Sequence, residues 1–347
     1  MKRIHYLAAI GLSAMIVSSC TNDEVMSTVS EPNVIGFKAM ANKSSRADGS
    51  VSTQNIDRFR VFGCVTDNNA STNHSVIFTN EIVTRPSLST NDWTYTNTQY
   101  WAPNKDYYFV AISTNNMEPK WTFSVPETHD ADAALNVAGF KGYGTVSMNI
   151  AEVNADRDLV YAYASRATNA EITDASQVHL TFNHMLSRIV VNFKNDMTTS
   201  GYTMSISNIK IGGLTAAGSV DLGVAPSALA WKPANEDPGT TVSVSIPDGN
   251  GIAIAQALSS DSKFIIPGSQ ELEISFDVDV KLNGAAYSKR SMSGKIAEAT
   301  YAPGCSYKLN ASISAENIVP GGAKPIEFIV DAVNTWGDDT DSDVDFN

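Results

Sequence analysis

Basic residues are scarce in this chain. Its 347 residues include 24 Lys and Arg against 37 Asp and Glu, which gives a formal net charge of −13. Proteins that bind nucleic acid gather basic side chains on one surface, because they must contact phosphates. The acidic balance therefore excludes nucleic acid as a partner.

The sequence also lacks the short motifs of common enzymes and metal sites. It contains no G-x-S-x-G, H-E-x-x-H, G-x-x-x-x-G-K-[ST] or C-x-x-C pattern. The odd spacing of His179 and His184 points them to opposite faces of an extended strand, which favours a structural role over metal binding. We predict a protein that is not an enzyme and needs no metal or cofactor.

Long apolar runs are absent except near the N-terminus. There, Lys2 and Arg3 precede a mostly apolar stretch at residues 4–17, and small residues lead to Cys20. The stretch is shorter than the about 20 apolar residues of a membrane-spanning helix. This order is typical of a bacterial lipoprotein, so we predict a signal peptide at residues 1–19 and a lipid on Cys20. The alternative is an ordinary signal peptide followed by an unmodified cysteine.

Only two further cysteines follow, Cys64 and Cys305. Outside the cytoplasm two thiols can form a disulfide, and their separation in sequence permits one. The alternative is that each is a small buried apolar side chain in a different part of the fold. The sequence leaves both interpretations open.

Apolar side chains are abundant, and they follow a period of two. Hydrophobic residues make up 43% of the chain, enough to bury a core. Leu272, Ile274, Phe276 and Val278 alternate with polar residues, which is typical of a strand with one buried face. The same alternation begins at Leu159, Val178, Ile189 and Tyr307. We predict an all-β protein built from antiparallel β-sandwiches.

The positions of the polar stretches predict the organisation of the chain. Residues 20–33 are interpreted as a tether, and residues 34–40 as a first strand. A polar connector precedes residue 178, so we expect one sandwich domain at 34–175 and another at 176–347. No internal repeat with a clear period is visible, which disfavours solenoids and propellers.

Several short segments share their order with a known family. They are the Cys20 signal, the Ser45-Arg46-Ala47 loop after the first strand, and residues 100–111 (YWAPNKDYYFVA), 158–162 (DLVYA), 178–189 (VHLTFNHMLSRI), 307–309 (YKL), 326–328 (IEF) and 333–336 (VNTW). Together they resemble the fimbrillin family of Bacteroidales over essentially the whole chain. The resemblance implies two transthyretin-like antiparallel β-sandwich domains in tandem. It also implies a lipoprotein precursor that is transported to the outer membrane and becomes a subunit of cell-surface fimbriae.

The resemblance further implies assembly by strand exchange. In such proteins a trypsin-like protease cuts after an arginine and frees the first strand, whose place a strand of another fimbrial subunit then takes. The matching cut lies between Arg46 and Ala47. The displaced strand includes Val34, Ile35, Phe37 and Met40. The alternatives are that Arg46 is an ordinary exposed arginine, and that the uncut chain serves as an anchor or accessory subunit.

A donated strand is expected at the C-terminus. Candidates are Ile326, Phe328 and Val330, and the alternating residues Val344 and Phe346 of the acidic tail. The alternative is a disordered acidic tail, because its aspartates repel one another and few apolar groups oppose them. Residues 339–343 alternate like the start of a calcium loop, but Val344 stands where such a loop needs glycine.

A rival function rests on aromatic residues. Trp93, Tyr95, Tyr100, Trp101, Trp121 and Trp231 are candidates for a sugar-stacking platform on a lipid-anchored protein that binds polysaccharide. Each is equally typical of a core. A fimbrial subunit with a role in adhesion to host or bacterial surfaces is the function that we favour.

Overall fold

The computed structural model describes residues 33–41, 56–68, 70, 75–114, 122–124, 145–150, 158–170, 177–222, 229–234, 239–246, 251–318 and 324–335. All of them belong to one compact unit, Asn33–Asn347. Apart from the short helix α1 (Ala315–Ile318), their regular structure is β-strand, so the all-β prediction is confirmed. No helix among these residues is long and apolar enough to cross a membrane.

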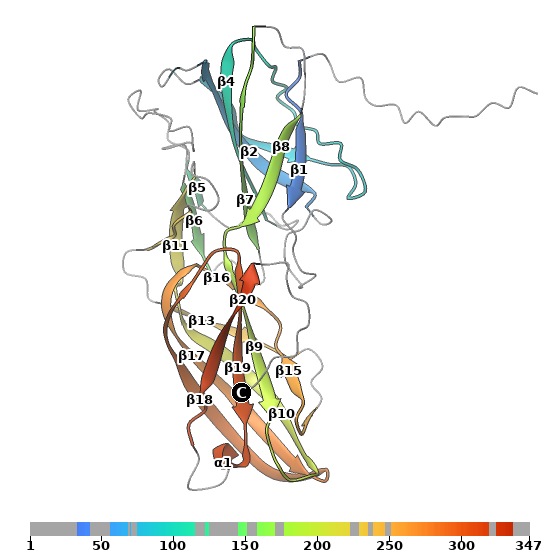
Figure 1. The fold of residues 1–347 in the computed structure, drawn as a ribbon, viewed down its shortest axis with the longest axis vertical. Helices are drawn as coiled ribbons and strands as arrows, with labels where there is room; N and C mark the ends of the chain where they lie inside the picture. The colour runs from blue at the N-terminus through green and yellow to red at the C-terminus, as the bar shows by residue number, and fades with distance from the viewer. Residues whose placement is uncertain are drawn as a thin grey trace, which may run out of the picture. The chain divides into compact units, whose positions relative to one another are not determined.

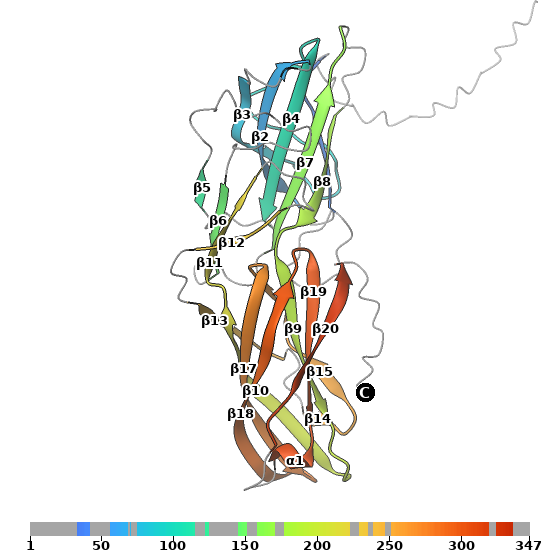
Figure 2. The same ribbon diagram turned by 60° about the vertical axis from the view of Figure 1, so that its left-hand side comes forward.

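A six-stranded sheet contains the strands nearest the N-terminus (Figures 1 and 2). In spatial order it consists of β1 (Phe37–Ala41), β8 (Val178–His184), β7 (Leu159–Ala167), β4 (Lys105–Thr114), β2 (Arg58–Asp67) and β3 (Ser75–Thr84). β4 lies in the middle of this sheet and is buried on both faces, which explains why it has the continuous apolar run YYFVAI instead of an alternation.

The other strands form three further sheets. One has the order β13 (Thr240–Val244), β10 (Tyr202–Leu214), β17 (Gly268–Leu282), β18 (Ala285–Tyr301), with β14 (Ile252–Ala253) also paired to β10. The second has β15 (Ala257–Ser259), β9 (Ser187–Asn195), β19 (Cys305–Ile313), β20 (Phe328–Thr335), with β16 (Lys263–Ile265) paired to β9. The third has β12 (Lys232–Pro233), β11 (Ala217–Asp221), β6 (Thr145–Asn149), β5 (Thr122–Ser124).

Period-two alternation locates many of these strands. The predicted strand at Leu272 to Val278 is the middle of β17, whose apolar side chains are buried while the intervening ones are more exposed. It pairs antiparallel with β10 and with β18. The turn from β17 to β18 uses Asn283 and Gly284, both with positive φ, as a two-residue hairpin with right-handed strand twist requires.

Two strand pairs differ from the antiparallel prediction. β1 runs parallel to β8, and β9 runs parallel to β19. Each pair joins strands that are distant in sequence, so no tight hairpin fixes their relative direction. The division into domains at residue 175 stays a prediction. Strand pairings cross this position, because β8 pairs with β1 and β7, and β11 pairs with β6.

One turn occurs twice, although the sequence shows no repeat with a clear period. Trp101 and Tyr301 each begin an aromatic-Ala-Pro run, and a tyrosine follows six positions later. The rings of Trp101 and Tyr107 lie 4.7 Å apart edge to face, and those of Tyr301 and Tyr307 lie 4.8 Å apart. We call each of these turns an aromatic corner.

The two aromatic corners also share their hydrogen bonds. The hydroxyl of Tyr107 accepts a bond from the N–H of Ala102 at 2.6 Å, and that of Tyr307 accepts one from the N–H of Ala302 at 2.7 Å. A central strand, β4 or β19, starts directly after each corner. The corners therefore set where these two strands begin.

Candidate functional site

The first segment, residues 33–41, changes its main-chain partner halfway. The N–H of Ile35 donates to the carbonyl of Gln99 at 2.9 Å, and the N–H of Trp101 donates to the carbonyl of Asn33 at 2.7 Å. From Gly36 onward the partner is β8, starting with the bond from the N–H of Val178 to the carbonyl of Gly36 at 2.7 Å. β1 is the last strand of its sheet, so its other edge has no strand beside it among the described residues.

Alternate side chains of the first segment enter the core. Ile35 is 0% exposed, and Phe37 and Ala39 are 1% exposed, whereas Met40 is 42% exposed. Val34 is half-buried and forms an isolated bridge with Tyr100. Of the residues assigned to the displaced strand, Ile35 and Phe37 are buried in the core and Met40 is exposed. Ala39, which period two counted from Phe37 would have identified, takes that position.

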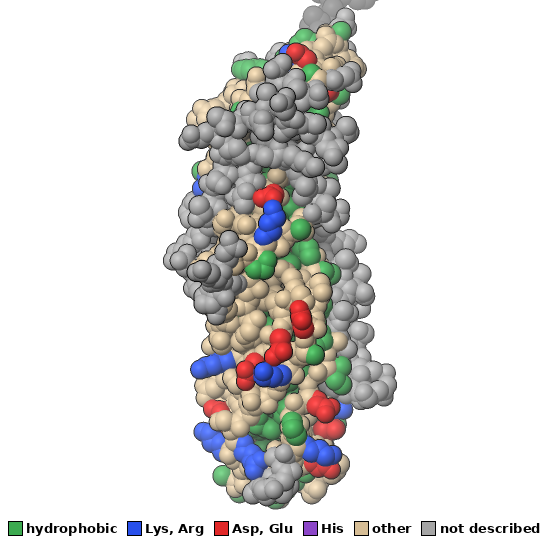
Figure 3. Space-filling view, turned by 90° about the vertical axis from the view of Figure 1, so that its left-hand side faces the viewer, with side chains coloured by type: hydrophobic (Ala, Val, Ile, Leu, Met, Phe, Trp, Pro, Cys, Tyr) green, Lys and Arg blue, Asp and Glu red, His purple; other side chains and the backbone are tan. Residues whose placement is uncertain are grey.

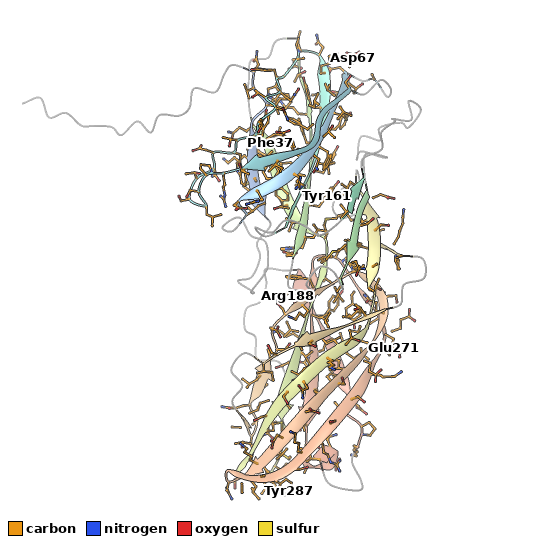
Figure 4. All side chains as sticks on the ribbon, turned by 180° about the vertical axis from the view of Figure 1, so that it is seen from behind. Phe37, Asp67, Tyr161, Arg188, Glu271 and Tyr287 are labelled. Carbon is orange, nitrogen blue, oxygen red and sulfur yellow. The ribbon has the colours of Figure 1, made fainter. Side chains whose placement is uncertain are left out.

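Phe37 lies in an aromatic cage. Its ring centroid is 5.9 Å from that of Phe59, 5.6 Å from Phe78, 5.6 Å from Tyr95 and 5.9 Å from Phe109. The contacts are edge to face, the arrangement that aromatic quadrupoles favour. Figure 4 labels Phe37 among the closely packed side chains of this part of the fold.

Glycine at position 63 makes room for the cage. A Cβ atom there would lie 2.9 Å from the ring of Phe78 and 3.2 Å from that of Phe109. Real Cβ atoms are not found at the shorter distance, so any larger residue would push the Phe78 ring aside. Gly63 therefore contributes to the site through its missing side chain.

Tyr95 joins the cage to the main chain of the first segment. Its hydroxyl donates to the carbonyl of Ile35 at 2.7 Å and accepts from the N–H of Gln99 at 3.3 Å. Burial raises the pKa of Tyr95, so the hydroxyl keeps its proton and stays a donor at physiological pH. Sequence reasoning identified Tyr95 only as a candidate sugar-binding ring.

The predicted donor strand lies in another sheet. Phe328 and Val330 are half-buried in β20, which pairs antiparallel with β19, and Ile326 just before it is buried. β20 and the first segment thus belong to different sheets. Cys20, Arg46, Ala47, Val344 and Phe346 lie outside the described residues.

Most of the aromatic residues of the rival platform are not on the surface. Trp93 and Trp101 are buried, 8% and 3% exposed, and the guanidinium groups of Arg85 and Arg166 lie over their rings. The indole N–H of Trp231 donates to the carbonyl of Met185 at 2.8 Å. Tyr95 belongs to the cage, and Tyr100 is 52% exposed. Trp121 is outside the described residues. The described members therefore form no shared stacking surface.

One histidine candidate is buried and the other is not. His184 Nδ1 and Asp158 Oδ2 lie 2.8 Å apart in a buried pair, while His179 is exposed. No three His, Cys, Asp or Glu side chains gather there in a way that could hold a metal ion. Cys64 is buried and Cys305 partly so, and both are thiols. Burial raises the pKa of the Cys305 thiol.

The surface mixes charges of both signs. Figure 3 shows one face on which acidic and basic side chains lie close together, with apolar side chains between them. Described pairs of this kind include Lys295 with Glu271 at 3.1 Å and Lys232 with Asp221 at 2.6 Å. Such pairs are exposed and contribute little to stability.

Comparisons with known proteins agree with the resemblance noted in the sequence. The model of the fimbrillin-like family matches residues 45–324. A fimbrial protein from Bacteroides vulgatus has a similar fold, with a TM-score of 0.57 at 15% identity over 86% of this chain and 99% of that one.

Two further solved structures have a lower similarity to this chain. A cell adhesion protein from Bacteroides uniformis gives a TM-score of 0.49 at 13% identity, over 87% of this chain and 98% of that one. The fimbrial anchor protein Mfa2 from Porphyromonas gingivalis gives 0.36 at 10% identity, over 87% and 100%. No curated protein matches the sequence.

Proposed function

Because the chain belongs to the fimbrillin-like family, we propose that it is a subunit or anchor of cell-surface fimbriae and that it joins its neighbours by strand exchange. The protein is a building block and not an enzyme. Its partners are other fimbrial subunits, and the assembled fibre contributes to adhesion to host or bacterial surfaces.

The first segment is the observation that carries this proposal. It lies at the edge of its sheet, and three alternate side chains fill a groove lined by aromatic rings. A strand from another subunit with the same alternation can replace it, because main-chain bonds to β8 do not depend on sequence and the cage accepts a matching ring. Removal of residues 34–40 would leave the cage exposed to water until such a strand arrives.

The C-terminal segment supplies the matching donor. Ile326, Phe328 and Val330 repeat the order aliphatic, Phe, small that Ile35, Phe37 and Ala39 present to the groove. Val344 and Phe346 are a second candidate pair for the same role. Use of β20 as a donor requires that it leave β19 in its own chain.

Processing of the N-terminus decides between a shaft subunit and an anchor. We propose that lipid on Cys20 carries the precursor to the outer membrane and that a cut between Arg46 and Ala47 releases the first segment. An uncut chain stays attached through Cys20 and acts as an anchor.

The test compares the wild type with Arg46→Ala, with Lys43→Ala as the matched control. Surface material is analysed by N-terminal sequencing and electron microscopy. We expect fibres that begin at Ala47 for the wild type and for Lys43→Ala, and no fibres for Arg46→Ala. Fibres built from chains that retain residues 21–46 would exclude the cut. A lipidated Cys20 on wild-type chains without fibres would exclude the shaft role and leave the anchor.

A further inference from the structure

We propose that residues 94–101, here called the latch, hold the N-terminal half of the first segment separately from β8, and that Tyr95 sets the rate at which this segment is exchanged. The inference rests on the proposed strand exchange and adds its regulation. Main-chain bonding, side-chain packing and the anchoring of the latch each support it.

The first support is the division of main-chain bonds. The N–H of Ile35 donates to the carbonyl of Gln99 at 2.9 Å, and the carbonyl of Asn33 accepts the N–H of Trp101 at 2.7 Å, so both main-chain bonds go to the latch. The β8 pairing covers Phe37 to Ala41. Loss of one set leaves the other intact, so the two halves of the first segment can open in separate steps.

The second support is that the latch is fixed elsewhere. Thr94 and Thr84 exchange two main-chain bonds, at 2.8 and 2.9 Å, next to the end of β3. The carboxylate of Glu81 accepts bonds from the N–H groups of Thr96 and Asn97 and from the Asn97 side chain, at 3.1, 3.2 and 2.6 Å. Neither β1 nor β8 takes part in these contacts. The latch therefore keeps its position when β1 leaves β8.

The third support is Tyr95, the latch residue that touches both the side chains and the main chain of the first segment. Its ring packs against Phe37 at 5.6 Å and against Phe78 at 5.3 Å. Its hydroxyl donates to the carbonyl of Ile35 at 2.7 Å and accepts a hydrogen bond from the N–H of Gln99 at 3.3 Å. Release of Ile35 requires this bridge to break.

An order of events follows. A cut between Arg46 and Ala47 creates a free chain end five residues after Ala41, on the side of the half that pairs with β8. The half at Phe37–Ala41 separates from β8 first, because β1 is the last strand of its sheet. The half beneath the latch leaves last, so the latch delays release until a partner strand has begun to pair with β8.

Hydrogen exchange in the full-length chain tests the latch without any partner. The variant is Tyr95→Phe, which keeps the ring and removes the hydroxyl. Tyr307→Phe is the matched control, because the Tyr307 hydroxyl, at the aromatic corner of Tyr301, likewise accepts a main-chain N–H, that of Ala302, and donates to a main-chain carbonyl, that of Thr300. Exchange is followed by mass spectrometry on overlapping peptides that cover residues 33–41.

In the wild type we expect the Ile35 amide to exchange more slowly than the β8-paired amides near residue 41. Tyr95→Phe should speed exchange at Ile35 by roughly five- to tenfold, the effect of losing one neutral hydrogen bond, and change residues 39–41 less than twofold. Tyr307→Phe should leave both rates unchanged. Equal acceleration over the whole of residues 33–41, or an unchanged Ile35 rate, would overturn the latch.

A second measurement separates failure of the latch from failure of strand exchange. A fluorescent peptide with the sequence of residues 33–41 is added to the full-length wild type and to Tyr95→Phe, and its uptake is followed by anisotropy. We expect uptake by both, about fivefold faster in the variant. Equal rates would contradict the latch alone. No uptake by either, with the expected hydrogen exchange, would contradict strand exchange and keep the latch.

Discussion

At the scale of single residues, Phe37 is the largest side chain that the first segment buries in the groove. Its side chain is fully buried among four other rings, and burial of a Phe side chain typically contributes about 2 kcal/mol through the apolar surface alone. The neighbouring Met40 points outward. The contrast between these two residues gives a direct test of which face of the first segment holds it in place.

Phe37→Ala should lower the free energy of unfolding by about 3–5 kcal/mol, because it removes the ring and leaves a cavity in the cage. Met40→Ala should change it by less than about 0.5 kcal/mol, as is usual for an exposed side chain. Urea denaturation of both variants measures the difference. Equal effects would mean that the first segment does not bury Phe37 in solution.

Two tyrosines of the C-terminal aromatic corner should differ in their response to loss of the hydroxyl. The hydroxyl of Tyr307 satisfies the N–H of Ala302, whereas the buried hydroxyl of Tyr301 has no hydrogen-bond partner among the described residues. Tyr307→Phe should cost about 1–3 kcal/mol, the penalty for an unsatisfied buried group. Tyr301→Phe should be neutral or stabilising. Thermal unfolding of the pair checks this, and a larger loss for Tyr301→Phe would be inconsistent with it.

Tyr301 also predicts a loss of stability at alkaline pH. Burial raises its pKa to about 12 from an ordinary value of 10. The folded state therefore disfavours the ionised form, so this contribution is fully present below pH 10 and is lost as the pH rises from 10 to 12. Between pH 10 and pH 12 the free energy of unfolding should fall by about 1–3 kcal/mol more in the wild type than in Tyr301→Phe. Urea titrations at pH 9 and pH 12 measure this, and parallel losses would argue against it.

At the scale of elements, the link between β8 and β9, residues 185 and 186, makes hydrogen bonds to other parts of the fold. At the end of β8, His184 Nδ1 lies 2.8 Å from Asp158 Oδ2. The N–H of Met185 donates to the carbonyl of Leu159, also at 2.8 Å. The carbonyl of Leu186 accepts the N–H of Gly304 at 2.8 Å. These contacts join the end of one sheet to the aromatic corner before β19, so the link is a fixed joint and not a free linker.

His184→Ala should destabilise the fold by about 3–5 kcal/mol, because it removes a buried partner of a fully buried carboxylate. His179→Ala, an exposed substitution five residues earlier, is the control and should have an effect below about 0.5 kcal/mol. Chemical denaturation of both gives the comparison. A loss of less than about 1 kcal/mol in His184→Ala would show that the pair is not buried in solution.

The strands differ in how well sequence predicts them. β8 and β17 alternate cleanly because one face of each is buried, so period two identified them. β4 is buried on both faces and lacks that signal. The parallel pairings of β1 and β9 depend on contacts between distant residues, which no local pattern encodes. Tyr95 was missed as a site residue for a related reason: its role depends on Ile35, sixty positions away.

At the scale of the whole molecule, net charge should control assembly. Acidic residues outnumber basic ones by 37 to 24 over the full sequence, so copies of the chain repel one another, and dissolved salt screens this repulsion. The Debye length falls from about 30 Å at 0.01 M salt to about 10 Å at 0.1 M. The rate of fibre formation should therefore rise across this range, as followed by light scattering. A rate that falls with salt would indicate that attraction between unlike charges drives the contact.

The parallel alignment of β1 with β8 has a consequence for any fibre built through this groove. A strand that takes the place of β1 in the same direction joins two different surfaces, a donor on one copy and an acceptor on the next. Such contacts repeat head to tail, and they build an open fibre when the rotation from one copy to the next does not close a ring. The fibre therefore has polarity, because one tip ends in an empty acceptor groove and the other tip ends in an unused donor strand. A new copy that brings its own donor strand can join only at the tip with the empty groove.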